Sequence, residues 1–458
     1  MKQSVQSPFS LRNIRLFIAL RVFFNTRFYY PVFTILFLDF GLTIEQFALL
    51  NTVWAATIVL FEVPSGALAD IVGRKQLLVI TSLLMIFELA LISFVPLGNM
   101  TLIFWVFLAN RVVSGLAEAM ASGADEALAY DTLVEQGWGD DWPRVLDVQM
   151  RMQSAGFVVT MTIGALVYDP VTVNHVLEWL GLSVTVTQQM TMRYPLYLTL
   201  ILGFLSLVTT LSMHETHVNK TKDAAGRTYR EIVSNALQLT WQAGGWIIRT
   251  PFALAVILFG MTCDHTLRMI VTLTSQYYRL IDLPEASFGL IGSGIGMLGL
   301  IVPKVARSMT ERFTPTRNLV ILILITLTGL FGLTGFYPYF GLLPMILIFV
   351  GMMLTSFFTS HYLNRITSSD QRATVLSFKG LSFNLTYGMI GLLYAGLIQY
   401  LRERSRSGNT GWSEQLVENQ AFRESIAWFP WYTIVMLSFL ILFCWWYLRH
   451  SSAHRQCG

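Results

Sequence analysis

Apolar segments long enough to cross a lipid bilayer follow one another along almost the whole chain. A membrane-spanning helix needs about 20 mostly apolar residues. Segments of this kind cover roughly residues 12–38, 44–65, 76–97, 102–128, 146–168, 194–213, 251–276, 286–307, 318–335, 341–362, 374–399 and 428–449. Backbone N–H and C=O groups find no water inside the bilayer, so each segment is expected to be a helix. The sequence therefore predicts an all-α membrane protein with twelve transmembrane helices.

The composition agrees with a bilayer as the solvent and argues against several other classes of protein. Hydrophobic residues make up 54% of the chain and charged residues only 13%, against about 25% charged in a soluble domain. The basic residues are dispersed and the net charge is only +4, so no nucleic-acid partner is expected. The three cysteines do not form a disulfide or metal-ligand pattern. No phosphate-binding loop or nucleophile elbow is present, so we expect no enzyme activity, cofactor or metal.

Two polar stretches interrupt the apolar pattern. Residues 214–250 are expected to be a linker and residues 400–427 a polar loop before the last helix. Within the linker, residues 229–246 are apolar enough for an amphipathic helix on the membrane surface, and a flexible linker is the alternative.

The linker sets the predicted domain boundaries. We expect an N-terminal six-helix bundle at 1–216, a cytoplasmic linker at 217–246 and a C-terminal six-helix bundle at 247–458. Most Lys and Arg residues between the spans fall on the side of both termini, which places the termini in the cytoplasm.

The two halves of the sequence are related by a shift of 241 residues. Phe-Ala-Leu-Leu at 47–50 matches Phe-Gly-Leu-Ile at 288–291. The same shift places Arg27 on Arg268 and Asp70 on Glu311. A parallel duplication of this kind predicts two pseudo-symmetric bundles of six helices each.

A charged, glycine-flanked turn lies between the second and third spans. Residues 66–75 read Gly-Ala-Leu-Ala-Asp-Ile-Val-Gly-Arg-Lys, which resembles the loop between helices 2 and 3 of the major facilitator superfamily of transporters. Residues 61–66 and 372–377 also resemble a bacterial branch of that superfamily with many drug-efflux members. The resemblance implies a transporter of the bacterial inner membrane. The copy of the loop in the second half, at Glu311, lacks the following Gly-Arg pair.

The resemblance also implies gating roles for this loop. Asp70 is expected to face the positive N-terminal end of the helix that begins at Arg372. Arg74 is expected to reach an acid near the end of the fourth helix, where Asp125, Glu126 and Asp131 are available. The alternative is a solvated turn that follows the distribution of positive charge. The predicted gating residues are Gly66, Asp70, Gly73, Arg74, Lys75, Asp125, Glu126 and Arg372.

Charged residues at membrane depth are costly and are therefore functional candidates. Arg111, Glu118 and Asp125 are spaced by seven, which predicts a polar stripe on one face of the fourth helix. Arg111 with Gly115 and Ala119 resembles a motif of proton-coupled members, which implies a role for Arg111 in proton coupling. A structural interhelical pair is the alternative. Glu118 is a second candidate for proton coupling.

The seventh span contains Asp264, His265 and Arg268. Asp264 and Arg268 are four residues apart, so they can neutralise each other on one helix face. Alternatively, Asp264 or His265 takes up a proton during transport. Two further acids, Glu62 and Glu88, have no evident partner in the sequence.

Arginines of the first and seventh spans are candidates for substrate binding. Arg27 and Arg268 occupy matching repeat positions, and two guanidinium groups suit a carboxylate or phosphate. Structural pairing of these arginines is the alternative. Arg21 and Asn25 share one face of the first span, and Tyr29 either stacks on a ligand or packs in the helix bundle.

The predicted function is secondary active transport of a small organic solute by alternating access, with proton-coupled efflux favoured. One alternative is an uptake carrier or exchanger for an organic anion, such as a carboxylate or phosphate metabolite or a siderophore. Another is a non-transporting receptor with a transporter fold. The expected partners are the solute, protons and the lipid bilayer, and the protein is expected to be a monomer.

Overall fold

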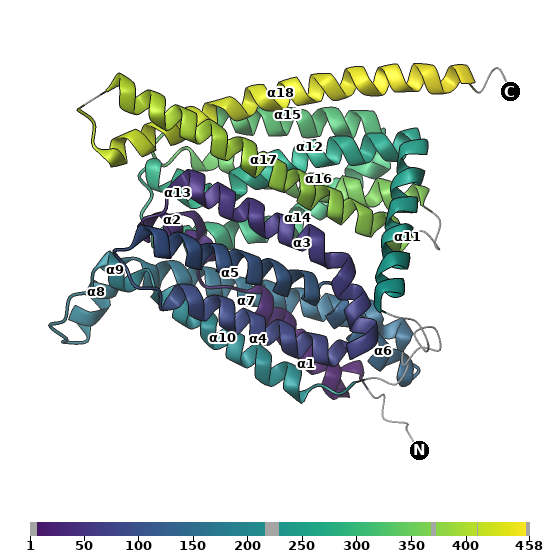
Figure 1. Ribbon diagram of the computed structural model, residues 1–458, viewed down its shortest axis with the longest axis horizontal. Coiled ribbons are helices and arrows are strands. Elements are labelled where there is room, and N and C mark those ends of the chain that lie inside the picture. The colour runs from purple at the N-terminus through teal and green to yellow at the C-terminus, as the bar shows by residue number, and fades with distance from the viewer. Residues whose placement is uncertain (1–6, 216–228, 368–371, 410, 455–458) are drawn as a thin grey trace. The chain divides into compact units, whose positions relative to one another are not determined.

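The computed structural model describes residues 7–215, 229–367, 372–409 and 411–454. Every regular element in these ranges is a helix (Figure 1). The α-helices are α1 (Arg12–Asn25), α2 (Phe33–Asp39), α3 (Ile44–Val72), α4 (Arg74–Ser93), α5 (Met100–Ala121), α6 (Ala124–Glu135), α7 (Trp142–Tyr168), α8 (Pro170–Trp179), α9 (Gln188–Thr191), α10 (Tyr194–Ser212), α11 (Tyr229–Arg249), α12 (Pro251–Thr272), α13 (Thr274–Leu280), α14 (Ser287–Arg312), α15 (Pro315–Leu333), α16 (Leu342–Ile366), α17 (Arg372–Gly408) and α18 (Glu414–His454). Among the described residues, 11 helical segments are long and apolar enough to cross a membrane. The all-α membrane fold predicted from the sequence is therefore confirmed.

The chain divides into two compact units that exchange one segment each. Residues 43–52, at the start of α3, group with the second half of the sequence, and residues 284–293 group with the first half. The shift of 241 relates these two segments at both of their ends. The same shift maps α2 onto α13, again at both ends. The helix boundaries thus follow the internal repeat, while the predicted domain boundaries at 217 and 247 stay a prediction.

The first predicted span, 12–38, is wrong as one continuous helix. The structure ends α1 at Asn25 and begins α2 at Phe33, with a short 3-10 helix at Tyr30–Val32 between them. Pro31 lies in this gap, and proline has no backbone N–H with which to continue a helix. Arg27 therefore lies in a helix break, so its direction does not follow from helical geometry.

The fourth predicted span, 102–128, is also interrupted. α5 ends at Ala121, and Gly123 has φ +77°, a left-handed conformation that favours glycine. Asp125 belongs to the next helix, α6. The prediction that Arg111, Glu118 and Asp125 form one stripe is therefore wrong, because the helix that would align them stops before Asp125.

The polar loop predicted at 400–427 is helical over most of its length. α17 continues to Gly408 and α18 begins at Glu414, so that only residues 409–413 connect them. Pairs such as Gln399–Glu403 and Gln420–Glu424 link side chains four residues apart, a spacing that supports a helix in polar surroundings. Figure 1 shows α18, in yellow, running alongside α15 in the same unit.

The predicted linker contains the helix α11. Trp241 on this helix is 84% exposed, whereas Ala243 and Ile247 are buried in an apolar cluster that includes Ala253 and Val375. Figure 1 shows α11 running across the direction of α12. Of the two alternatives for residues 229–246, the structure has the amphipathic helix. Residues 217–228 lie outside the described residues.

Candidate functional site

The turn at residues 66–75 joins α3 to α4 through a single glycine. Gly73 has φ +100°, which disfavours any residue with a Cβ atom. A Cβ atom at this position would also lie 2.8 Å from the Glu215 carboxylate. That carboxylate accepts a hydrogen bond of 2.9 Å from the backbone N–H of Lys75. The side chains of Asp70 and Arg372 lie outside the described residues, so their contact stays a prediction.

Two arginines bind the acids of α6. Arg74 forms an ion pair with Asp131, one of the three acids that the sequence offered as its partner. Arg21, from α1, pairs with Asp125 at 3.2 Å and also with Glu126. The structure thus brings a predicted substrate residue, Arg21, together with two predicted gating residues.

Asn25 does not join this cluster. Its amide donates to the backbone carbonyl of Arg21 at 3.0 Å, one turn back on the same helix. The geometry gives Asn25 a role within α1.

A buried ion pair lies at the break between α1 and α2. Arg27 and Glu88 approach to 2.5 Å, with side chains only 4% and 0% exposed. Arg27 also donates to the Tyr29 hydroxyl at 2.9 Å. The Asn110 amide donates to the second carboxylate oxygen of Glu88 at 3.2 Å. Glu88 has no evident partner in the sequence, but in the structure both of its carboxylate oxygens have one.

Arg111 extends this network along α5. Its Nε donates to the Asn110 side-chain oxygen at 3.0 Å. Its guanidinium lies 5.4 Å and 5.2 Å from the ring centroids of Phe33 and Phe37, a cation–π arrangement. One terminal nitrogen of this 4% exposed side chain has no hydrogen-bond partner among the described residues. A ligand or a moving side chain could use that donor.

Glu118, also on α5, differs from the other acids of the first unit. Its carboxylate interacts electrostatically with Arg27 and Glu88 but forms no ion pair or side-chain hydrogen bond with the described residues. Glu62 resembles it, because one of its carboxylate oxygens is buried without a partner in the described part of the chain. The two acids flank one helix contact, in which the Ser65 hydroxyl donates to the backbone carbonyls of Glu62 and Ala119.

In the second unit, Asp264 and Arg268 form the ion pair that their spacing predicts, at 2.7 Å. Arg268 also donates to Asn384 at 3.0 Å and lies 5.2 Å from the centroid of the Tyr387 ring. Its side chain is 26% exposed. Arg268 is therefore less enclosed than Arg27.

His265 uses both of its ring nitrogens. Nδ1 lies 2.7 Å from the Met261 carbonyl, and Nε2 lies 2.9 Å from the Tyr432 hydroxyl. A carbonyl oxygen can only accept, so Nδ1 carries a proton. In the neutral ring Nε2 accepts from the Tyr432 hydroxyl, whereas after proton uptake Nε2 would donate to the Tyr432 oxygen, which requires only the hydroxyl hydrogen to rotate.

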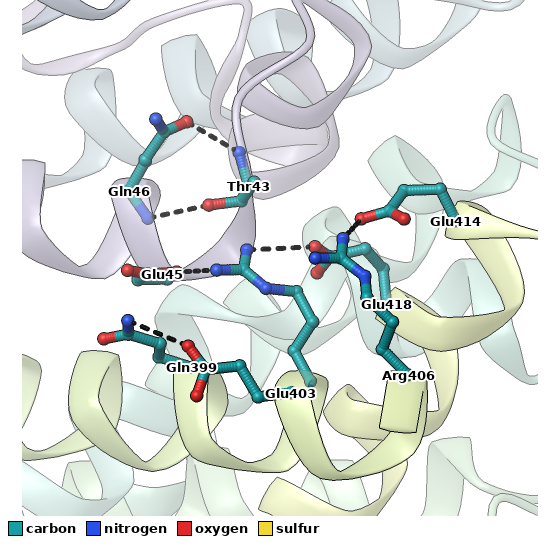
Figure 2. A network of polar contacts seen from close by, with 9 residues as sticks. Thr43, Glu45, Gln46, Gln399, Glu403, Arg406, Glu414 and Glu418 are labelled. Carbon is teal, nitrogen blue, oxygen red and sulfur yellow. Dashed lines mark hydrogen bonds and ion pairs between the residues drawn. The ribbon is translucent and has the colours of Figure 1, made fainter. Parts of the chain in front are cut away.

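A cluster that sequence reasoning missed lies at the start of α3. Arg402 of α17 pairs with Glu45 of α3 at 2.5 Å and with Glu418 of α18 at 3.2 Å. Thr43 and Gln46 exchange hydrogen bonds at the N-terminus of α3, forming a capping box that holds Glu45 there. Figure 2 shows Thr43, Glu45, Gln46 and Glu418 of this cluster together with the Arg406–Glu414 pair. Glu45 and Arg402 are 357 residues apart, so no sequence spacing could have indicated the contact.

Comparisons with known proteins agree with the helical architecture. The family model described as Major Facilitator Superfamily matches residues 16–390. No curated protein matches the chain in sequence.

Solved structures of membrane transporters resemble the chain, among them the following three. A bacterial homologue of the human lysosomal transporter Spinster is 13% identical with a TM-score of 0.71, covering 97% of this chain and 99% of that one. The nucleoside transporter NupG is 12% identical with a TM-score of 0.67, covering 94% and 98%. A D-xylose–proton symporter is 12% identical with a TM-score of 0.61, covering 94% and 96%. Identities this low show a shared fold.

Proposed function

The chain belongs to the major facilitator superfamily and is a multi-pass membrane transporter rather than an enzyme, and we propose that it moves a small organic solute by alternating access coupled to protons. The D-xylose–proton symporter of similar fold supports a proton as the coupling ion. The resemblance of residues 61–66 and 372–377 to efflux proteins supports export across a bacterial inner membrane.

The environment of Glu118 carries the proposal of proton coupling. Glu88, Asp125, Asp131 and Asp264 each have an arginine partner. Glu118 has none among the described residues, although it lies at membrane depth. An unpaired carboxylate is expensive in such surroundings, so Glu118 is the acid best placed to hold a proton when dry and to release it when water reaches α5.

Loss of that proton would act on the neighbouring ion pair. Ionised Glu118 attracts Arg27 and competes with Glu88 for it. Glu88 also accepts from Asn110, which in turn accepts from Arg111. A change at Glu118 therefore reaches Arg27 and Glu88 through electrostatic interaction, and then reaches Arg111 through the hydrogen bonds of Asn110, which gives coupling between a proton and a ligand a physical route.

Two ion-pair clusters supply the proposed gates. One contains Arg74–Asp131 and Arg21 with Asp125 and Glu126. The other contains Arg402 with Glu45 and Glu418. A rocking transporter needs contacts that form in one state and break in the other. In the predicted orientation, the first cluster lies on the cytoplasmic side and the second on the periplasmic side.

The alternative of an organic-anion carrier is favoured by one observation. Arg268 is partly exposed and is held by an ion pair within its own helix, a hydrogen bond to Asn384 and a cation–π contact with Tyr387, so it could turn to a carboxylate or phosphate. Arg27 is enclosed with Glu88. We therefore place the anion-binding role on Arg268. The paired clamp and the receptor function stay predictions.

Transport by purified protein in liposomes tests the proposal. A pH gradient is imposed, a trapped pH dye reports proton flux, and candidate solutes are added from separate classes: uridine, D-xylose, citrate and ethidium. We expect one class to drive proton flux, and Glu118→Gln to abolish that flux while leaving binding of the same solute. Glu178→Gln, in an exposed segment outside the spans, is the matched control. Transport that continues unchanged after the pH gradient is collapsed would contradict proton coupling. A Glu118→Gln protein that still moves protons would contradict it as well.

A further inference from the structure

The segment 169–187 lies between two membrane spans and exposes an unusual amount of apolar surface. It contains α8 and the connection to α9, and it falls between the candidate spans that end at Tyr168 and begin at Gln188. Its large exposed apolar residues are Val171 (60%), Val176 (49%), Trp179 (84%), Leu180 (58%), Leu182 (51%) and Val184 (60%). Apolar exposure is ordinary inside a span but needs an explanation outside one.

The segment has a defined fold of its own. Asp169 caps α8 by accepting from the backbone N–H groups of Val171 and Thr172. The Asn174 side chain donates to the Val186 carbonyl at 3.0 Å and accepts from the Val186 N–H at 2.8 Å, which closes the connection into a loop. Figure 1 shows α8 next to α9, at one end of the helices of its unit. The apolar side chains are thus held outward by local structure.

We propose that the segment 169–187 is an interfacial anchor whose apolar side chains enter the headgroup region of the bilayer. Its attachment supports a lipid occupant, because α8 begins two residues after α7 ends. A helix of 10 residues is about 15 Å long, so the patch stays close to the membrane surface. Tryptophan with aliphatic neighbours is typical of membrane–water interfaces.

The charges of the segment specify the kind of lipid surface. Its only acids are Asp169, which caps α8, and Glu178, and it contains no lysine or arginine. Attraction to anionic headgroups therefore contributes nothing, and burial of apolar surface is the driving force. Insertion is expected to be the same in phosphatidylcholine and phosphatidylglycerol vesicles.

Spin-label accessibility in liposomes tests the anchor without knowledge of the transported solute. Single cysteines replace Trp179 and, separately, Val176 in full-length protein in which Cys263, Cys444 and Cys457 are replaced by alanine. The control is Ser407→Cys, an exposed site on the charged end of α17. Each cysteine carries a nitroxide, and its collision rates with oxygen and with a water-soluble nickel chelate are measured.

We expect the oxygen rate to exceed the nickel rate several-fold at 176 and 179, and the reverse at 407, in both lipids. If the labels at both patch positions collide with the nickel chelate as often as the label at 407, the proposed anchor is rejected. The patch would then be accessible to a protein partner. Two patch positions guard against a local distortion by one substitution. The result is independent of whether the protein moves protons.

Discussion

Arg27 and Arg268 occupy the same position of the repeat but are held in different ways. Arg27 lies in a helix break, is 4% exposed and pairs with Glu88 from another helix, α4. Arg268 lies inside α12, is 26% exposed and pairs with Asp264 one turn earlier on the same helix. The Arg27 pair holds the break between α1 and α2 against α4, whereas the pair within α12 can open without moving either end of that helix. The duplicated position has thus become a packing contact in one half and an accessible cation in the other.

Among substitutions in these two ion pairs, removal of the Glu88 carboxylate is expected to have the largest effect on stability. Glu88→Ala leaves the Arg27 guanidinium buried without its counter-charge, and breaking a buried pair from one side costs about 3–5 kcal/mol. We expect a large loss of thermal stability in detergent, measured by the unfolding temperature of purified protein.

The matched control removes both charges. Arg27→Met combined with Glu88→Met replaces the pair by apolar side chains and should recover much of the lost stability. A single Glu88→Ala variant as stable as the parent would show that Arg27 finds water or another acid, and the contrast with Arg268 would fail.

Substitution of Arg268 comes next and separates binding from stability. If Arg268 holds the anionic group of a solute, Arg268→Gln removes hydrogen bonds to a charged partner, worth about 1.5–3 kcal/mol. Affinity for that solute should fall roughly tenfold or more, a larger loss than the accompanying fall in stability explains, since Asp264 also loses its ion-pair partner. Calorimetric titration of an anionic ligand found in the solute screen measures this.

Arg27→Gln provides the comparison for the Arg268 variant. It should lower stability, and affinity should then fall only as folded protein is lost. Equal affinity of Arg268→Gln and the parent protein would reject the anion-binding role.

The two ion pairs also differ in how far the sequence could predict them. The Asp264–Arg268 contact follows from a spacing of four on a continuous helix. The Arg27–Glu88 contact joins residues 61 positions apart and depends on the break at Pro31, which a count of apolar residues does not show. The break at Gly123 removed Asp125 from its predicted stripe for the same reason. Apolar length locates the membrane-spanning segments, but it does not show where a span is interrupted.

Asp264→Asn is expected to have a smaller effect on stability than Glu88→Ala. The introduced amide retains a side-chain oxygen for Arg268, and Asn384 still accepts from that guanidinium. The loss should be about 1 kcal/mol, in the range of a single hydrogen bond. The ratio of the unfolding-temperature changes in the two variants therefore measures the difference between the duplicated positions. Equal destabilisation would mean that the pair in α12 is as structural as the buried pair.

The exposed fraction of the Arg402 side chain is intermediate between those of Arg27 and Arg268. Its substitution has the smallest expected effect on free energy. Its side chain is 17% exposed, and those of Glu45 and Glu418 are 18% and 21% exposed, so water weakens each ion pair. Partly exposed pairs contribute about 1 kcal/mol or less, which changes an equilibrium between two states by up to about fivefold. If the cluster is a gate, Arg402→Gln should shift the population toward opening at this end, because Glu45 and Glu418 then repel each other without a positive charge between them.

The rate at which a maleimide modifies a cysteine at Thr52 measures that opening, in protein from which the native cysteines have been removed. Thr52 lies two turns further along α3, where its hydroxyl donates to the Gly388 carbonyl of α17. Arg402→Gln should speed labelling a few-fold. Arg406→Gln is the control, since the Arg406–Glu414 pair lies nearby but joins only α17 and α18. Equal labelling rates in both variants would assign Arg402 to the stability of the α17–α18 hairpin. A faster rate in Arg402→Gln alone would identify an ion pair weak enough to break in every transport cycle, unlike the buried Arg27–Glu88 pair.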